Sequence, residues 1–194
     1  MTTIKIVGCD PSLRNFGFAQ ATLNVHTLEY TIDNLILVES ESENGKTVRK
    51  NSDDLRRASN LYQGMINACK GAVLAIAEIP VGSQSSRAMA SYGMCVGVLA
   101  ACPIPLIEVT PAEVKLAAAG YKQTTGRKQA TKENMIEWAM NKHPGANWLL
   151  RKLKGNMVPV ADNEHLADAC GAIEAGIRTS QFQQAIALYR SMAA

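Results

Sequence analysis

The chain has 194 residues, of which 47% are hydrophobic, and a formal net charge of +3. This length suits one globular unit with a sizeable core, so we expect a single domain over residues 1–194 rather than two independent domains. A charge of +3 is too common to indicate nucleic-acid binding by itself, and the five cysteines form no C-x-x-C pair that would indicate zinc or redox work.

The sequence also argues against export or membrane insertion. Residues 1–9 do not resemble a signal peptide, and the longest apolar stretch, residues 94–107, is interrupted by Pro103 and Pro105 and is too short to span a bilayer. We therefore expect a cytoplasmic protein whose cysteines are buried, reduced thiols.

The first third of the chain predicts three strands and a helix. Residues 4–9 form a β-branched apolar run that ends at Asp10-Pro11, which indicates a buried strand with an acid at its end. Residues 16–23 and 28–38 continue with strand-like composition and predict an antiparallel meander. Residues 53–69 then carry apolar side chains at helical spacing, with Ser52 or Asp53 as the expected cap.

A second buried strand, residues 72–77, ends at Glu78 in the way that the first ends at Asp10. We expect a helix of small residues after it, a further strand at 104–109, and later helices at 112–119, 128–141, 162–178 and 181–192. Strands that come first and then alternate with helices predict an α/β protein with a mixed sheet flanked by helices.

Acidic side chains end both buried strands, and a third group opens the helix expected near residue 162. If the two strands are neighbours, Asp10 and Glu78 lie side by side. His165 and Asp168 are three residues apart and share one face of the helix. Charged groups that face an apolar sheet are costly to bury without a partner, which a cation would supply. Taken singly, Asp10-Pro11 is an ordinary turn, but together these groups suit hydrolysis of phosphodiesters with two metal ions.

Basic residues concentrate in one part of the chain. Residues 115–154 contain nine Lys or Arg against two Glu, whereas the rest contains eleven basic and fifteen acidic residues. A solvated face would explain such a stretch, but we favour a DNA-binding patch with phosphate contacts in the loop around Arg127 and Lys128.

Several of these segments resemble, in the same order, the RuvC family of Holliday junction resolvases. They are "GCDPS", "LAIAEIP", "VTPAEVKLAAAG", "KQATKENM" and "HLADA", spread over residues 4–177, and "GSQSSRA" resembles the phage-encoded branch in particular. The resemblance implies a ribonuclease H-like fold with a five-stranded mixed sheet.

The resemblance also implies an activity and its residues. The expected activity is a magnesium-dependent endonuclease that acts as a homodimer on four-way junctions, making paired nicks with 5′-phosphate ends. Two Mg²⁺ ions per site, with Mn²⁺ as a substitute, would bind Asp10, Glu78, His165 and Asp168. Lys132 would complete the catalytic set. The implied DNA contacts are Ser83, Gln84, Ser85, Arg87, Lys115, Arg127, Lys128 and Lys132. No nucleotide cofactor or membrane is implied, and a phage protein would act in the host cytoplasm.

Two departures from the family pattern widen the expected substrate range. Ser12 stands where a glycine is usual, and Val81 stands where cellular members carry an aromatic residue. Both favour looser selectivity, with flaps and other branched DNA as further substrates. The alternatives are a structure-specific DNA-binding protein without efficient cleavage and an actin-like phosphotransferase, which would need a duplicated domain and glycine-rich loops.

Overall fold

A five-stranded mixed sheet forms the centre of the protein. The computed structural model describes residues 2–43, 49–119 and 131–192. The strand order is β3-β2-β1-β4-β5; β1, β2 and β3 pair antiparallel, and β4 and β5 continue parallel to β1. The predicted mixed five-stranded sheet is therefore confirmed. Its strands are β1 (Thr3–Asp10), β2 (Asn15–Asn24), β3 (Tyr30–Glu39), β4 (Leu74–Glu78) and β5 (Leu106–Val109).

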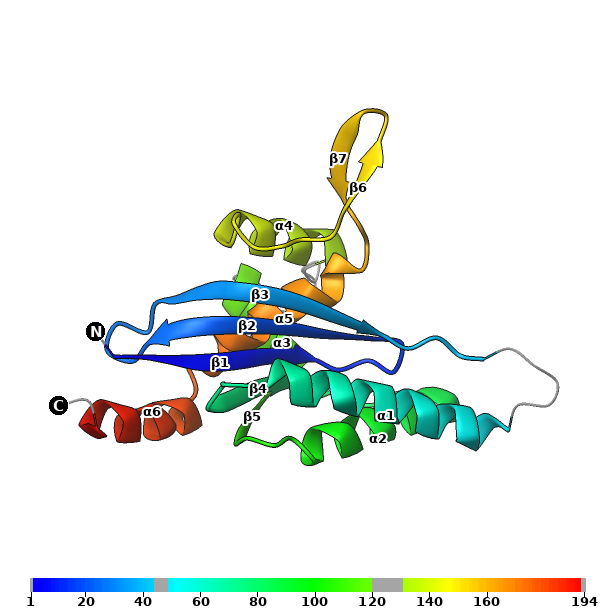
Figure 1. Cartoon of the computed structure of the whole chain (residues 1–194), viewed down its shortest axis with the longest axis horizontal. Helices are drawn as coiled ribbons and strands as arrows, with labels where there is room; N and C mark the ends of the chain where they lie inside the picture. Colours follow the sequence, from blue (N-terminus) through cyan, green and yellow to red (C-terminus); the bar gives the residue numbers. More distant parts are fainter. Residues whose placement is uncertain (1, 44–48, 120–130, 193–194) are drawn as a thin grey trace.

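Helices cover both faces of this sheet (Figure 1). One face packs against α1 (Lys50–Ala68) and α2 (Ser86–Ala100). On the opposite face α5 (Asn163–Gly176) packs directly on the sheet, α3 (Pro111–Ala119) and α4 (Lys132–Lys142) pack against α5, and α6 (Ser180–Met192) adds apolar side chains to the same core. Because both faces of the sheet are covered, consecutive residues are buried in two of its inner strands, at 6–9 of β1 and 74–77 of β4.

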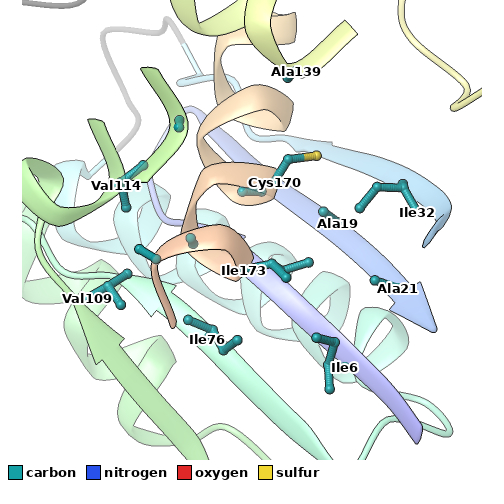
Figure 2. Close-up of a cluster of buried hydrophobic side chains, with 14 of the residues drawn as sticks. Ile6, Ala19, Ala21, Ile32, Ile76, Val109, Val114, Ala139, Cys170 and Ile173 are labelled. Atoms are coloured by element: carbon teal, nitrogen blue, oxygen red, sulfur yellow. The ribbon is translucent and has the colours of Figure 1, made fainter. Parts of the chain in front are cut away.

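Helix α5 lies at the centre of its layer. Figure 2 shows Cys170 and Ile173 of this helix over Ala19 and Ile76 of the sheet. Glycines allow the helix to approach so closely, because a Cβ on Gly8 would lie 2.0 Å from the Ala169 carbonyl oxygen. The backbone contact at Gly8 therefore fixes how α5 sits on β1.

Two local predictions differ from the structure. Helix α1 begins at Lys50, and Asp53 is not its cap; the Asp53 side chain instead accepts hydrogen bonds from Arg56 (2.7 Å) and from the Glu43 backbone (3.3 Å). Helix α4 begins at Lys132 rather than at residue 128, because Thr131 caps it in a reciprocal capping box with Asn134.

A hairpin that the sequence reading missed projects beyond α4 (Figure 1). It consists of β6 (Leu150–Leu153) and β7 (Asn156–Pro159), which pair antiparallel around a two-residue turn at Lys154 and Gly155. The available signal was the Lys-Gly pair itself, because glycine is the residue that such turns favour.

Two further expectations can be compared with the structure. All five cysteines are free; four are buried and Cys102 is half-buried. Within residues 2–43, 49–119 and 131–192, no helix combines the length and the apolar character needed to cross a bilayer.

Candidate active site

The acids that end β1 and β4 lie at the same edge of the sheet. The two strands are parallel neighbours, and Cys9 pairs in register with Ala77. The next residue on each strand is Asp10 or Glu78, so the two carboxylates lie side by side where the strands end. The expectation that these strands are neighbours is confirmed. The chain that connects the end of β1 to the start of β4 is more than sixty residues long.

Helix α5 brings the histidine to this edge. His165 Nδ1 lies 2.6 Å from Asp10 Oδ2. The approach requires a glycine on β2, because a Cβ on Gly17 would lie 2.2 Å from the His165 carbonyl oxygen. The start of the helix is also anchored to β2, since Asn15 Nδ2 donates to Asp162 Oδ1 at 3.1 Å.

The carboxylates at this edge raise one another's pKa. Burial raises the pKa of Glu78 to about 8, with further contributions from the negative charges of Asp10 and Asp168. Burial likewise raises the pKa of Asp168 to about 7, assisted by Asp10 and Glu164. Several buried acids of like charge are thus held together, an arrangement typical of functional sites and unfavourable without a positive partner.

Asp10 and His165 titrate as a pair. Burial raises the pKa of Asp10, although the hydrogen bond from His165 works in the opposite direction. Burial disfavours the charged imidazole, but the hydrogen bond and charge of Asp10 outweigh it and raise the pKa of His165. Because Nδ1 donates to Asp10, the Nε2 atom of a neutral imidazole remains available as a base or a metal ligand.

The chemistry of these donors fits a hard divalent cation. Carboxylate oxygens predominate, and Asp168 Oδ1 is buried without a hydrogen-bond partner among the residues that the structure describes. In this conformation, however, no three acidic, histidine or cysteine side chains of the described residues lie close enough together to hold an ion. Asp10 and His165 contact each other instead.

Two lysines border the acids. Lys132 Nζ lies 2.6 Å from Glu164 Oε2 at the start of α4, and its positive charge lowers the pKa of Asp10. Lys115 on α3 is half-buried, and its charge lowers the pKa of both Glu78 and Asp168 without offsetting the burial. Both lysines therefore lie near enough to influence the cluster electrostatically.

The other expected DNA contacts divide into three groups. Ser83, Gln84 and Ser85 are exposed between β4 and α2, and Ser85 caps α2 by accepting from the Ala88 backbone. Arg87 is held by Asp54 through two bonds of 2.6 Å, which tie α2 to α1. The remaining group, Arg127 and Lys128, lies outside the described residues.

Glu164 lies in the first turn of α5 and also belongs to the acidic cluster. It pairs with Lys132, and its charge raises the pKa of Asp10, Glu78 and Asp168. Its position four residues before Asp168 was the available signal, because that spacing keeps two side chains near one helical face.

A groove of about 700 Å³ extends from this cluster toward the hairpin. Its lining includes Glu164 and Lys132 as well as Arg151 and Pro159 of the hairpin. The cluster and the hairpin are therefore continuous on the surface of the protein.

Comparison with known proteins gives the same architecture. No protein-family model matches the sequence. The RuvC of Thermus thermophilus in complex with a Holliday junction substrate has a TM-score of 0.62 with this chain at 13% identity, over 94% of this chain and 97% of that one. A second structure of Thermus thermophilus RuvC has a TM-score of 0.58 at 15% identity, over 88% of this chain and 92% of that one. The chain has the RuvC fold. The ribonuclease H-like α/β architecture expected from the sequence is thereby confirmed.

Proposed function

We propose that this chain is a divalent-metal-dependent endonuclease that resolves Holliday junctions. The observation that carries the proposal is the gathering of Asp10, Glu78, His165 and Asp168 at one edge of a RuvC-like sheet. A binding protein without chemistry would gain nothing from several buried acids of raised pKa.

The same four side chains are the proposed ligands of two Mg²⁺ ions, for which Mn²⁺ would substitute. Bound divalent cations make water a better nucleophile and stabilise the oxygen that leaves phosphorus. Asp168 Oδ1, which accepts no hydrogen bond from any residue that the structure describes, would be one of the ligand atoms. A positive charge beside Glu78 and Asp168 would return both carboxyls to their ionised state near neutral pH.

The remaining groups orient the substrate and manage protons. When its Nε2 does not bind a metal ion, His165 can take a proton from water through that atom while Nδ1 remains bonded to Asp10. Lys132 is 72% exposed and can exchange Glu164 for a phosphate oxygen. Lys115, Arg127, Lys128 and the segment from Ser83 to Arg87 are proposed to contact the DNA backbone.

The substrate and the assembly complete the proposal. We expect a homodimer of single-domain chains, one active site for each of two opposite strands, and nicks that leave 5′-phosphate ends. Val81, three residues after Glu78, is 82% exposed, and we propose that an aliphatic side chain there favours activity on flaps as well as on junctions. The proposed setting is the cytoplasm of a host cell, as for a phage-encoded enzyme.

Cleavage mapping on a mobile four-way junction tests this function. The wild type should nick opposite strands in Mg²⁺ or Mn²⁺ and not in EDTA. Asp10→Asn and Asp168→Asn should each lower the rate by more than about 100-fold and still bind the junction without metal. Glu108→Gln, which removes an exposed acid on β5, is the matched control and should cut normally. Wild-type rates in either Asn variant would refute the assigned site.

One observation favours a second candidate, a branched-DNA-binding protein without efficient cleavage. Asp10 and His165 bond each other, and in the described part of the chain no three ligands converge. Tight metal-free binding to junctions, combined with no nicking under any divalent cation, would establish this alternative.

A further inference from the structure

The β6–β7 hairpin takes no part in the chemistry proposed above. Its ten residues, 150–159, contain Arg151, Lys152 and Lys154 and no acid. Leu150, Leu153 and Met157 are 45%, 48% and 60% exposed. An isolated two-stranded hairpin is marginally stable in water, so one that also exposes apolar side chains is suited to a partner.

The base of the hairpin is fastened to the helix that carries His165 and Asp168. Val160 N–H donates to the Leu149 carbonyl at 3.0 Å and so closes the base. Asn163, fully buried at the start of α5, accepts from Leu149 N–H at 3.0 Å and donates to the Leu149 carbonyl at 2.7 Å. The hairpin is therefore positioned relative to the acidic cluster, two residues before His165.

The tip of the hairpin holds a lysine where another residue would fit better. Lys154 has a φ of 48° and Gly155 a φ of 89°. Positive φ is unusual for residues other than glycine and is tolerated best by asparagine or aspartate. A lysine at this position is unfavourable for the turn, and its charge at the outermost point of the hairpin offers a reason for its presence.

Each face of the hairpin combines a cation with apolar groups. Cross-strand pairing places Lys152 beside Met157, with Leu150 and Pro159 on the same face. The opposite face carries Arg151 and Leu153. Positive charge next to small apolar surfaces matches the backbone and the sugar edges of duplex DNA, which proteins often contact with Lys, Arg, Leu and Met in the minor groove.

The groove at the base of the hairpin does not suit phosphates. It is lined by Glu133, Glu137 and Glu164 as well as by Lys132 and Arg151. Except beside Lys132, the three glutamates would repel a phosphate backbone, so the hairpin's own contacts belong on its outer part.

We propose that the β6–β7 hairpin is a DNA-binding arm that contacts one duplex arm of the branched substrate beside the scissile strand. Lys152 and Lys154 contact phosphates, and Leu150 and Met157, on the same face as Lys152, pack against the minor groove. This inference rests on the proposed function and adds a substrate-contacting element to it.

Binding of a labelled four-way junction in EDTA, measured by fluorescence anisotropy at several salt concentrations, tests the arm. The double variant Lys152→Ala/Lys154→Asn should bind about tenfold more weakly, and the slope of log K against log salt should become shallower by about 2. The double variant Leu150→Ala/Met157→Ala should also bind several-fold more weakly, but its slope should not change. Lys70→Ala removes an exposed lysine at the far edge of the sheet and should match the wild type in both respects.

Folding effects can be separated from binding effects. Asparagine suits the backbone at Lys154, so the lysine double variant should melt at or above the wild-type temperature while it binds more weakly. A shortened chain in which an Asn-Gly turn joins Leu149 to Val160 is feasible because these residues are already hydrogen-bonded. It should keep its melting temperature and reproduce the loss of affinity.

The results distinguish failure of the arm from failure of the function. If the wild type binds and nicks junctions but the three hairpin variants bind as tightly and with the same slope, the arm is refuted and the nuclease stands. Unchanged DNA affinity with a lowered solution mass would make the hairpin a contact between copies of the chain, which also overturns the inference. If the wild type does not bind branched DNA, the proposed function itself is wrong.

Discussion

Replacing Asp168 by asparagine should make the metal-free protein more stable above pH 7, although it removes a proposed metal ligand. Burial and the charges of Asp10 and Glu164 raise the Asp168 pKa from 3.8 to about 7. Between pH 3.8 and about pH 7, the Asp168 carboxyl therefore keeps its proton in the folded state, whereas it has already lost the proton in the unfolded state. Stability falls as the pH rises through this window, and the full penalty is present above pH 7.

The size of the effect follows from the same values. One pKa unit corresponds to about 1.36 kcal/mol. The rise of the Asp168 pKa from 3.8 to about 7 therefore lowers the free energy of unfolding by about 4 kcal/mol above pH 7. Neighbouring acids redistribute protons and reduce this figure, so we expect a gain of roughly 2 kcal/mol in the free energy of unfolding. For a chain of this size that is about 4–8 °C in melting temperature. Asparagine breaks no hydrogen bond at Asp168 Oδ1, since this atom has no partner among the described residues.

Differential scanning calorimetry in EDTA from pH 4 to pH 8 measures the effect. The difference between Asp168→Asn and wild type should be near zero at pH 4 and greatest above pH 7. Added Mn²⁺ should then stabilise the wild type and leave the variant nearly unchanged. Glu108→Gln, the exposed control, should follow the wild type throughout. A variant that melts below the wild type above pH 7, or a difference independent of pH, would refute the electrostatic reasoning.

Three further changes have defined outcomes. Gly17→Ala would place a Cβ 2.2 Å from the His165 carbonyl, so it should cost about 1–3 kcal/mol in a thermal melt and lower the nicking rate about 100-fold; an unaffected rate would show that α5 tolerates displacement. Asn163→Ala loses both bonds to Leu149, and hydrogen exchange should become faster in residues 150–159, whereas unchanged protection there would contradict the anchoring role. Burial lowers the His143 pKa from 6.5 to about 4, so wild-type stability should fall as the pH drops through that window. His143→Phe should weaken that fall by about 2 kcal/mol in urea titrations, and an equally steep fall would exclude His143 as its source.

The sequence by itself determined the types of element and the residues that end them. Apolar runs broken by Pro11 and Pro80 specify buried strands whose last residues are Asp10 and Glu78. The i, i+3 spacing of His165 and Asp168 places both on one side of α5. These features depend on local backbone preference and on periodicity, which neighbouring residues decide.

The hairpin and the helix starts show where local reading falls short. The short strands β6 and β7 are mostly exposed, so they lack the apolar run by which β1 and β4 were recognised. The start of α1 was misplaced because Asp53, a favourable cap in isolation, instead accepts hydrogen bonds from Ser42 and from the Glu43 backbone in the segment before the helix. Tertiary contacts override such weak preferences.

Only the tertiary structure decided which of these groups meet. The sequence does not reveal that Gly17 lies under His165, that Asp10 bonds its imidazole, or that Glu164 joins the acids while holding Lys132. These contacts join residues far apart in the chain, and they depend on how closely α5 packs on β1 and β2. That distance is fixed by the packing of the whole core, to which every strand and helix contributes, so no local pattern contains it.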